Sequence, residues 1–564
     1  MPNLDPTVLI VGAGPSGLMA ALLLERLGVP VAIIERRPTV QRAPAAHVVN
    51  ARTLEICRAA GVDMHALGEV AVSPADGGRV YWVPKLGAPP IGGLPFENQT
   101  DEQDAVTPTP LRNISQHRFE PILVRALEEA GGATPQWRHQ WESAVQDADG
   151  VTSVVRDLDT DAVRQVRSRY VIAADGAGSR IRKSLAIDMI GPAHLQSFLM
   201  IHFRADLRRI VGDPPGVLHF ICDPIHGGGV FVIHDLDREA VYMHAFDPDQ
   251  ESVDDYSIAR CEQIVRDSLA DPSLALAVEA FGTWTMTAQV AERYREQRVF
   301  LVGDAAHRFP PTGGLGLNTG VQDVHNLAWK LAAVIHESAP PALLDTFEIE
   351  RRPVAQHNAD QSLHNALQLI EVGAALGVTD NTEASRARMH ATLADAEGRT
   401  RVAAAIERQA VHFDMPGLQL GFAYAAGAII PDTGEAPAND PRTFIPSGRP
   451  GARLPHAWTQ DATARGSLLD WVPLDRFLLL AGPDGEAWVD AAAQIEGVAI
   501  VGRRLRPEDV PTLPAWLAIA GIGSAGALLI RPDQHIAWRA VDGVDDPVGT
   551  LQSVLRTVLH DTSR

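Results

Sequence analysis

The sequence predicts a mixed α/β (α+β) protein built from several domains. Its first 35 residues read as a strand, a glycine-rich turn, a helix and a second strand, which is how a parallel sheet begins. Residues 186–287 carry runs of alternating polarity, which favour an antiparallel sheet. From about residue 441, strands and helical segments alternate again. A chain of 564 residues is long enough for roughly three or four domain-sized units.

The glycine-rich turn reads GAGPSG and directly follows the β-branched run TVLIV at residues 7–11. Gly12 permits the tight turn, Gly14 lets the backbone approach a pyrophosphate, and Gly17 lets the helix pack closely on the strand. Glu35 closes the second strand, where a carboxylate can hold ribose hydroxyls. This context predicts a dinucleotide site and leaves NAD and FAD both open.

Two later segments place an aspartate at the carboxyl end of a buried strand. Residues 170–182 read YVIAADGAGSRIR and contain Asp175, and residues 298–304 read RVFLVGD and end on Asp304. Open α/β sheets bind their ligands at this edge. We therefore expect both carboxylates to lie in the same site as the glycine-rich turn.

With these three motifs in this order, the chain resembles the flavin-dependent aromatic hydroxylases of the p-hydroxybenzoate hydroxylase fold. The resemblance includes Gln116 in ISQHRFEPIL, the helix QDVHNLAWKLA and the segment LLDTFEIERRPVA. It covers nearly the whole chain and is closest to the phenol, chlorophenol and 2-hydroxybiphenyl monooxygenases with a thioredoxin-like C-terminal domain. It implies FAD as cofactor, NADH or NADPH as transient reductant, O2 as co-substrate, and hydroxylation of a phenolic ring, ortho to the hydroxyl, through a flavin C4a-hydroperoxide.

The loop GDAAHRFPPTGGLGLNTGVQD, residues 303–323, reads as a flavin cradle. Asp304 can accept hydrogen bonds from ribityl hydroxyls, and prolines fix an extended path without backbone donors. The glycines let the backbone pass close to the flavin ring, and a helix restarts near Leu317 and Asn318 with its positive end toward the ring. The expected cofactor-binding residues are Gly12, Gly14, Pro15, Ser16, Gly17, Glu35, Arg36, Gln116, Asp175, Gly303, Asp304, Pro311, Gly313, Gly316, Leu317 and Asn318.

His47, in APAAHVVNARTLEI, is the expected catalytic base that ionises the phenol, because phenolic relatives carry a histidine here; a structural histidine is the alternative. Relatives often have an arginine two residues earlier, where this chain has Ala45, and Arg42 or Arg52 could replace it. Weaker candidates for the base on the predicted antiparallel sheet are His219, His234, Tyr242 and His244. Trp284, Met286 and Pro311 are expected substrate contacts, with core packing an equal alternative for Trp284 and Met286.

The expected domains are discontinuous in sequence. Residues 1–75, 105–185 and 288–365 form the Rossmann-like FAD-binding domain, and residues 76–104 and 186–287 form the substrate-binding sheet domain. Residues 366–440 are a helical connector and linker, and residues 441–564 are a thioredoxin-like domain without a CxxC motif. The apolar stretch 515–530 is too short for a membrane span, and a loop followed by a buried strand is expected there.

Composition limits the partners. The net charge of −21 disfavours nucleic acid and anionic membrane surfaces, and the three cysteines are far apart, which indicates no structural metal site and a reducing compartment. No signal peptide is recognised at the N-terminus, and a cytoplasmic location is expected. The expected partner is a small phenolic substrate; NADH versus NADPH and a homodimer are left open.

Several other functions remain open on sequence grounds. The same framework serves tailoring hydroxylases of larger polyketide-like aromatics, as well as flavin oxidases and dehydrogenases. A flavin-dependent halogenase is disfavoured, because TWTMTA lacks the second tryptophan of a WxWxIP-like segment. A non-enzymatic FAD-binding regulator is the remote alternative.

Overall fold

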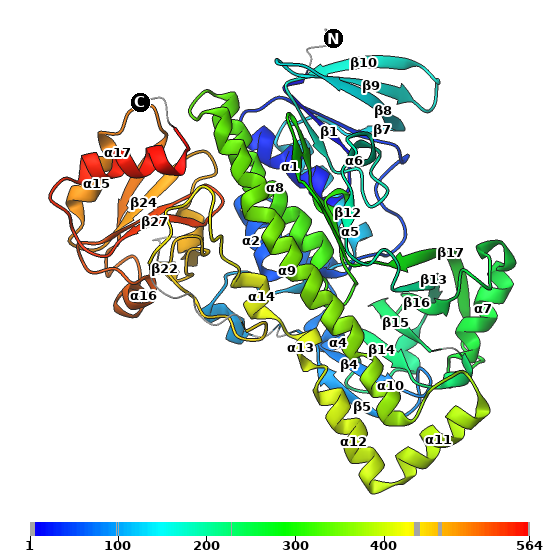
Figure 1. Cartoon of the computed structure of the whole chain (residues 1–564). Coiled ribbons are helices and arrows are strands. Elements are labelled where there is room, and N and C mark those ends of the chain that lie inside the picture. The colour runs from blue at the N-terminus through cyan, green and yellow to red at the C-terminus, as the bar shows by residue number, and fades with distance from the viewer. Residues whose placement is uncertain are drawn as a thin grey trace.

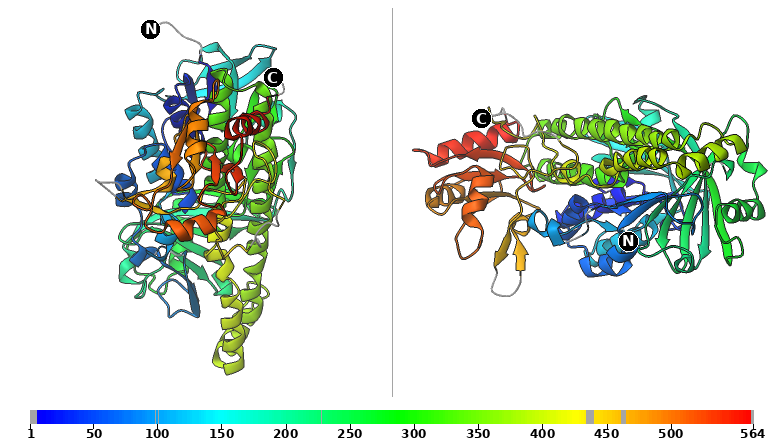
Figure 2. Two further views of the ribbon diagram at one scale, coloured as in Figure 1. Left: turned by 90° about the vertical axis from the view of Figure 1, so that its left-hand side faces the viewer. Right: turned by 90° about the horizontal axis from the view of Figure 1, so that it is seen from below.

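The computed structural model describes residues 6–97, 99, 101–226, 228–433, 440–460 and 465–561. Three bodies lie in a row: a C-terminal domain at one end, a central domain around a parallel sheet, and a large antiparallel sheet at the other end (Figures 1 and 2). The mixed α/β fold predicted from the sequence is confirmed.

The central domain is built on a six-stranded sheet of order β19-β20-β11-β1-β2-β7. All neighbouring strands in it are parallel except the β19–β20 pair. Short β-branched and apolar runs form the inner strands, which are buried throughout because both faces are covered. The strands are β1 (Val8–Val11), β2 (Val31–Glu35), β7 (Gln136–Trp137), β11 (Tyr170–Ala173), β19 (Arg295–Glu296) and β20 (Val299–Leu301).

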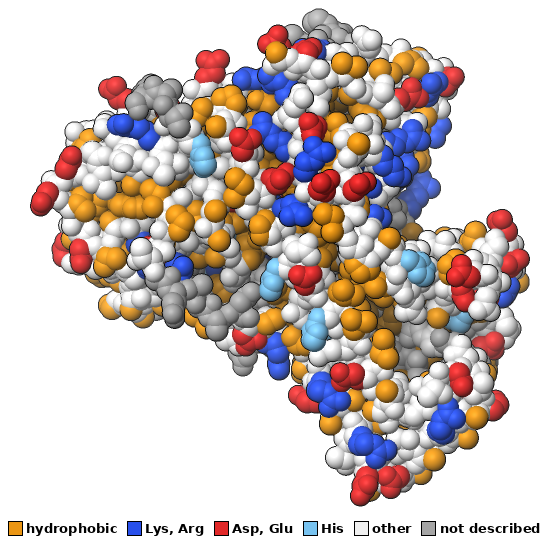
Figure 3. Space-filling view, viewed as in Figure 1, with side chains coloured by type: hydrophobic (Ala, Val, Ile, Leu, Met, Phe, Trp, Pro, Cys, Tyr) orange, Lys and Arg blue, Asp and Glu red, His pale blue; other side chains and the backbone are white. Residues whose placement is uncertain are grey.

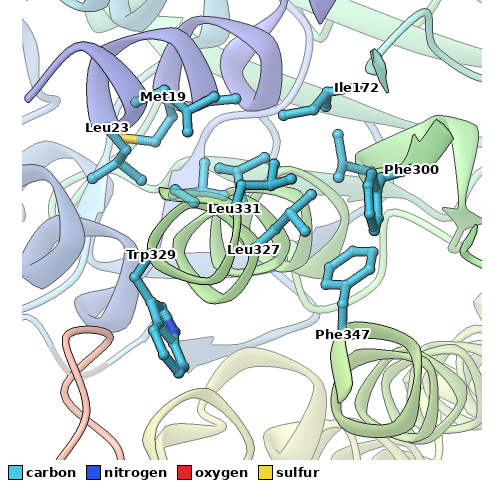
Figure 4. Close-up of a cluster of buried hydrophobic side chains, with 14 of the residues drawn as sticks. Met19, Leu23, Ile172, Phe300, Leu327, Trp329, Leu331 and Phe347 are labelled. Atoms are coloured by element: carbon cyan, nitrogen blue, oxygen red, sulfur yellow. The ribbon is translucent and has the colours of Figure 1, made fainter. Parts of the chain in front are cut away.

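Helices α1 (Pro15–Arg26), α5 (Gln116–Glu129) and α8 (Leu315–Ile335) pack around this sheet, with α1 against both of the others. In Figure 4, Met19 and Leu23 of α1 meet Leu327 and Leu331 of α8, and Phe300 of β20 lies next to Phe347 of α9 (Thr346–Gln368). The same core includes apolar residues of a small antiparallel sheet of β8 (His139–Gln146), β9 (Val151–Asp157) and β10 (Val163–Ser168).

The second large sheet has seven strands in the order β17-β13-β16-β15-β14-β4-β5. Its pairs are antiparallel except β14–β4, so the period-two runs predicted as an antiparallel sheet are confirmed. One face packs against α7 (Ile258–Asp267), and the other turns toward the central domain. The strands are β4 (Arg79–Val83), β5 (Gly92–Pro95), β13 (Gln196–Ala205), β14 (Leu218–Ile221), β15 (Gly229–Asp235), β16 (Glu239–Phe246) and β17 (Leu276–Met286).

A helical segment follows α9 and leads toward the C-terminal domain. It passes beneath β5, the edge strand, and its neighbour β4, where buried residues of α10 and α12 join one apolar cluster with Val80 and Trp82 (Figure 1). Its helices are α10 (Ile370–Leu376), α11 (Glu383–Ala394), α12 (Ala396–Glu407), α13 (Ala410–Phe413) and α14 (Pro416–Leu420).

The C-terminal domain has the order strand, helix, strand, helix, strand, strand, helix. Its sheet order is β25-β24-β26-β27, with β24 and β25 parallel and the other pairs antiparallel, which is the arrangement of the thioredoxin fold. The elements are β24 (Phe477–Ala481), α15 (Glu486–Ala493), β25 (Ile500–Arg504), α16 (Leu513–Ala520), β26 (Ala527–Ile530), β27 (Ile536–Ala540) and α17 (Pro547–Val558).

One sequence expectation is wrong. The apolar stretch 515–530 was expected to be a loop followed by a strand, yet its first part lies in helix α16. Pro514 stands in the first turn of that helix, and Gly521 ends it in the left-handed conformation with φ 65°. Among the described residues, no helix combines the length and the apolar character that a bilayer crossing needs. Basic and acidic side chains are intermingled over the upper part of the face in Figure 3.

Candidate active site

The predicted glycine-rich turn lies between β1 and the first turn of α1. Gly12 has φ 106°, and a Cβ there would lie 2.2 Å from the carbonyl oxygen of Ala174. A Cβ on Gly17 would lie 1.9 Å from the carbonyl oxygen of Gly12. Both glycines are therefore required by packing, whereas a Cβ on Gly14 would meet nothing within 4 Å. The open side of this turn lies at Gly14, beside the partly exposed Pro15 and the N-terminus of α1.

Glu35 lies at the end of β2 next to this turn and is 7% exposed. Its Oε2 accepts a hydrogen bond from the backbone N–H of Ala13 at 2.8 Å, and Oε1 accepts one from the N–H of Arg37 at 2.8 Å. Oε2 keeps a second acceptor site for a ligand hydroxyl, whereas Oε1 also faces Nε of Arg37. Arg36 is exposed and points away from the interior, whereas Arg37 pairs with Glu35 at 3.2 Å.

Asp175 and Asp304 lie at the carboxyl ends of the neighbouring strands β11 and β20. Asp175 Oδ2 accepts a hydrogen bond from the backbone N–H of Arg180 at 2.8 Å. Its Oδ1 is buried and has no hydrogen-bond partner within the described chain, and burial raises the pKa of this carboxyl. Asp304 is exposed, and only the charges of His307 and Arg308, with no hydrogen bond, act on its carboxyl group within the described residues. Both carboxylates can therefore accept hydrogen bonds from a ligand.

Two glycines bring three backbones together behind Asp304. A Cβ on Gly303 would lie 2.7 Å from Oγ of Ser16, and a Cβ on Gly320 would lie 2.3 Å from the same atom. The N-terminus of α1, the turn after β20 and the first part of α8 thus meet at Ser16. This close packing sets the glycine-rich turn and the loop before α8 in one fixed relation.

The loop before α8 has one crowded side and one open side. Gly314, with φ 61°, is the N-cap residue, and a Cβ there would lie 2.5 Å from Cβ of Val48; a Cβ on Gly313 would lie 2.3 Å from Cε of Met415. In contrast, a Cβ on Gly316 would meet no atom within 4 Å, and Pro311 is exposed. Helix α8 begins at Leu315, two residues before the predicted restart.

Leu317 is partly exposed beside Gly316, but the Asn318 side chain faces the protein. Asn318 Oδ1 accepts a hydrogen bond from the N–H of Asn50 at 2.9 Å, and Nδ2 donates to the carbonyl oxygen of Val48 at 2.9 Å. The predicted cofactor contact of Asn318 is therefore limited to its backbone. Its side chain fastens the first turn of α8 to the segment that carries His47.

These features fit FAD. Open space at Gly14 and Gly316 leaves room for a pyrophosphate and a flavin ring, and the N-termini of α1 and α8 favour negative charge at those two points. The unpartnered Oδ1 of Asp175 and the exposed carboxylate of Asp304 supply acceptors for the hydroxyls between the two ends. Among the described residues, no cluster of His, Cys, Asp and Glu is suited to a metal ion.

His47 is half-buried beside this site, immediately before β3 (Val48–Val49). The carbonyl oxygen of His47 accepts a hydrogen bond from the N–H of Ile114 at 2.8 Å, and that of Ala46 accepts one from the N–H of Gln116. Nδ1 of His47 lies 3.3 Å from Oδ1 of Asn113. With the proton on Nδ1 this contact is a hydrogen bond, and Nε2 is then the nitrogen that can accept a proton.

Burial lowers the pKa of His47 to about 4, and the hydrogen bond to Asn113 opposes this only in part. The imidazole is therefore neutral at neutral pH. The Phe96 ring stacks on it with 6.1 Å between ring centroids. Phe96 and Asn113 were missed by sequence reasoning, because each lies far from His47 in the chain and in no motif. The Gln116 side chain donates to Oε1 of Glu120 at 2.7 Å and so supports the start of α5.

The face of the large sheet toward the central domain carries Trp284, which stacks on Phe198 with 6.0 Å between ring centroids. Met286 follows on the same side of β17 and is 9% exposed. Of the four weaker candidates for the base, only His234 lies on this face. His219, Tyr242 and His244 lie on the face toward α7, where Tyr242 stacks on Phe231. They are outside the candidate site.

One expected replacement for the missing arginine is excluded. Arg52 is 1% exposed and points into the interior, where its guanidinium donates to Oε2 of Glu55 at 3.0 Å, to Oε1 of Gln534 at 2.6 Å and to the carbonyl oxygen of Asp533 at 2.7 Å. It cannot reach a nicotinamide or flavin. Arg42 is exposed near Ala45 and remains available.

A parallel sheet with a dinucleotide-type turn, two strand-end aspartates and a glycine-rich loop before α8 is the arrangement expected of a flavoprotein. Residues 5–362 match the family described as FAD binding domain, and residues 447–561 match the one described as aromatic-ring hydroxylase, C-terminal. The chain belongs to this family of FAD-dependent aromatic-ring hydroxylases. It is a flavin-dependent aromatic monooxygenase, with FAD as cofactor and with NAD(P)H and O2 as implied co-substrates.

Relatives with different substrates match over almost the full length. The 2,4-dichlorophenol 6-monooxygenase of Delftia acidovorans is 32% identical, covering 99% of this chain and 98% of its own. The tetracenomycin B2 monooxygenase-dioxygenase of Streptomyces olivaceus is 34% identical over 100% of both chains. The solved structure of the flavin-dependent monooxygenase PieE, in complex with FAD and substrate, is 34% identical, with a TM-score of 0.92 over 99% of this chain and 100% of that one.

Proposed function

We propose that this enzyme hydroxylates a phenolic ring ortho to its hydroxyl group, and that His47 is the base that ionises the phenol. The observation that carries the proposal is the placement of His47. Its imidazole is neutral, its Nδ1 lies within hydrogen-bond distance of Asn113, and its segment is fastened through Val48 and Asn318 to the first turn of helix α8. A phenolate is a better nucleophile than a phenol toward an electrophilic oxygen. When bound, FAD supplies that oxygen from O2 at the cost of one NAD(P)H.

The residues of this chain orient the ring and keep water away. Phe96, which stacks on His47, and the apolar side chains around Trp284 would be the contact surfaces for an aromatic ring. His47 Nε2 would accept the phenolic proton, and the contact with Asn113 orients the imidazole. The flavin-side contacts would come from Gly14, Gly316, Glu35, Asp175 and Asp304, as placed above.

A second candidate is the hydroxylation of a larger polyketide-like aromatic. A cavity of about 250 Å³ lies between the sheet edge and α10, lined among others by Trp82 and Phe220. Both rings contact Phe413, which contacts Phe96, the ring that stacks on His47. This apolar volume would accommodate further rings if Phe413 turned aside. This cavity favours the same ring hydroxylation on a larger substrate.

A substrate panel tests these proposals. Small phenols and polycyclic phenols are incubated with the holoenzyme, NADH or NADPH and ¹⁸O2, and nicotinamide oxidation and product mass are measured. We expect a substrate to accelerate flavin reduction and one ¹⁸O atom to enter the product next to the phenolic oxygen. Stoichiometric peroxide release with every phenol and no labelled product would support an oxidase instead. The size of the preferred substrate decides between the two candidates.

We further propose a cytoplasmic enzyme that acts on a free small molecule and binds neither nucleic acid nor membrane. The net charge of −21 supports this, since it repels both kinds of anionic surface. A homodimer is left open; light scattering of the holoenzyme measures the oligomeric state.

A further inference from the structure

A cavity of about 250 Å³, partly open to solvent, lies between helix α10 and the part of the large sheet formed by β4 and β14 (Figure 1). Trp82 and Phe220 line it from the sheet. Leu369, Val372 and Leu376 line it from the helix side. The described lining residues include no Asp, Glu, Lys, Arg or His. A charged molecule would lose hydration there without gaining an ion pair, so the cavity suits an uncharged and mainly apolar one.

The wall on the sheet side is aromatic. The rings of Trp82 and Phe220 stack on each other with 5.1 Å between centroids and an interplanar angle of 14°. Trp82 is buried, whereas Phe220 is partly exposed. Aromatic rings attract one another in offset-stacked and edge-to-face arrangements, beyond the gain from burying their apolar surface. This wall therefore favours an aromatic ligand over an aliphatic one of the same size.

The helix on the other side leaves the space open. Gly373 lines the cavity from the middle of α10, and a Cβ at this position would meet no atom within 4 Å. Its neighbours Val372 and Leu376 are each 1% exposed and fix the helix to the apolar layer below the sheet. A glycine inside a helix weakens that helix relative to alanine. The helix thus lacks a side chain at the point where one would reduce the cavity.

The two walls are tied together by polar contacts outside the cavity. Arg386 of α11 donates from Nε to Oδ1 and from Nη2 to Oδ2 of Asp223, both at 3.0 Å, and Asp223 follows β14. Arg388 of α11 donates from Nε to the carbonyl oxygen of Gly377, at the end of α10, at 2.9 Å. Helix α11 therefore holds α10 and the end of β14 in a fixed relation. A cavity that exists before its ligand arrives binds at a lower cost in entropy.

Two aromatic rings separate this cavity from His47. Phe413 is 1% exposed and contacts Trp82 and Phe220, with 5.9 and 6.0 Å between ring centroids. Its ring also contacts Phe96, which stacks on His47. His47, Phe96 and Phe413 are not among the described residues that line the cavity. With Phe413 in this position, the cavity can hold a molecule of its own.

We propose that this cavity is a second binding site, separate from the site at His47, for an uncharged aromatic molecule of one or two rings. An engineered apolar cavity of about 150 Å³ in another protein binds benzene. The volume of about 250 Å³ therefore has room for a substituted ring or for two fused rings. Asn381 lines the cavity and is exposed, so its amide can bond a hydroxyl or carbonyl group of the ligand. The ligand is held without any covalent step.

The test measures the binding of fluorobenzene to the oxidised holoenzyme by equilibrium dialysis, with the bound amount per FAD determined by ¹⁹F NMR. Gly373→Leu fills the cavity, and leucine favours the helix more than glycine does. This variant should bind about one molecule fewer per FAD than the wild type, with its FAD content unchanged. Gly68→Leu in α3 (Met64–Val70) is the matched control, because it is a helical glycine whose Cβ would also meet no atom within 4 Å.

A crystal structure of the holoenzyme with iodobenzene locates the site directly, and it decides the matter even if Gly373→Leu does not fold. We expect an anomalous iodine signal between α10 and the rings of Trp82 and Phe220. Iodine found only elsewhere overturns the proposal, as does equal binding of fluorobenzene by Gly373→Leu and the wild type. A wild-type enzyme that binds no fluorobenzene also overturns it. These measurements involve no turnover, so the hydroxylation proposed above stands or fails separately in the substrate panel.

Discussion

Glu350 of α9 and Arg531, which follows β26, form a two-pronged ion pair that is completely buried between the central and C-terminal domains. Nη1 of Arg531 lies 2.8 Å from Oε1 of Glu350, and Nη2 lies 2.8 Å from Oε2. Lys330 of α8 donates to the same carboxylate at 2.7 Å, and Asp533 pairs with Arg531. Buried charges of both signs thus join the C-terminal domain to α8, the helix that begins at the glycine-rich loop.

Replacing Arg531 by methionine should destabilise the whole protein. Two buried carboxylates would lose their principal cation, and breaking a buried pair in this way costs about 3–5 kcal/mol. Denaturant unfolding of the holoenzyme measures the loss. Arg58→Met is the control, since Arg58 pairs with Asp470 at 2.7 Å on the surface, where such pairs contribute about 0–1 kcal/mol. Equal effects of the two substitutions would contradict the structural role of the buried pair.

Glu350 should also give the protein a defined acid sensitivity. Burial by itself raises its pKa, but the charges of Arg531 and Lys330 outweigh this and lower the pKa to about 2. A folded pKa below the unfolded value of about 4.3 gives stability that is present above that pH and lost as the pH falls toward 2. The free energy of unfolding, measured from pH 6 to 3, should fall in this window. In Glu350→Gln this part of the fall should be absent.

Gly14→Val should abolish FAD binding while the protein stays folded. The side chain would enter the open space where the pyrophosphate approaches the N-terminus of α1, and no protein atom lies within 4 Å to be displaced. Flavin absorbance after purification and a titration with FAD measure the effect. Gly68→Val in α3 (Met64–Val70) is the control, because its Cβ would be equally unhindered but far from the site. A yellow Gly14→Val protein would disprove the assignment.

Trp284→Ala should weaken substrate binding with FAD retained. Loss of its flat contact surface should raise the KM for the aromatic substrate about tenfold, which corresponds to ~1.4 kcal/mol. Phe281→Ala is the control, three residues earlier on β17 and packed on the side toward α7. Steady-state kinetics on both variants measure the KM for the aromatic substrate. A KM that rises only in Phe281→Ala would indicate that the substrate binds on the face toward α7 and would contradict the prediction.

The placement of the proposed FAD contacts in the fold was predictable because their signals are local. The turn at Gly12–Gly17 and the aspartates at 175 and 304 each follow a buried strand, and parallel strands bring their carboxyl ends to one edge. The surroundings of His47 could not be predicted from local sequence. His219 and His234 lie on strands of the same sheet, and a shift of one residue would exchange their faces. The burial of Arg52 depends on Gln534, 482 residues away, which no local pattern reveals.

The rate of hydroxylation should not fall as the pH drops through 6.5, the ordinary pKa of a histidine. Since burial lowers the pKa of His47 to about 4, the imidazole stays neutral, and able to accept a proton, down to that pH. The kcat/KM for a phenol should therefore show no ionisation of His47 between pH 7 and 5. An acid limb near 6.5 that disappears in His47→Ala would contradict this assignment of the pKa.

The most direct test of the account is the hydroxylation rate of His47→Ala with a series of phenols of different acidity. FAD should be retained, because its proposed contacts at Gly12–Gly17, Asp175 and Asp304 are left in place, and flavin reduction should change less than hydroxylation. Hydroxylation should fall about 10²-fold or more, least for the most acidic phenols, and recover in part at high pH, where water ionises the phenol. An equal loss for all phenols at every pH would contradict the role of His47 as the base.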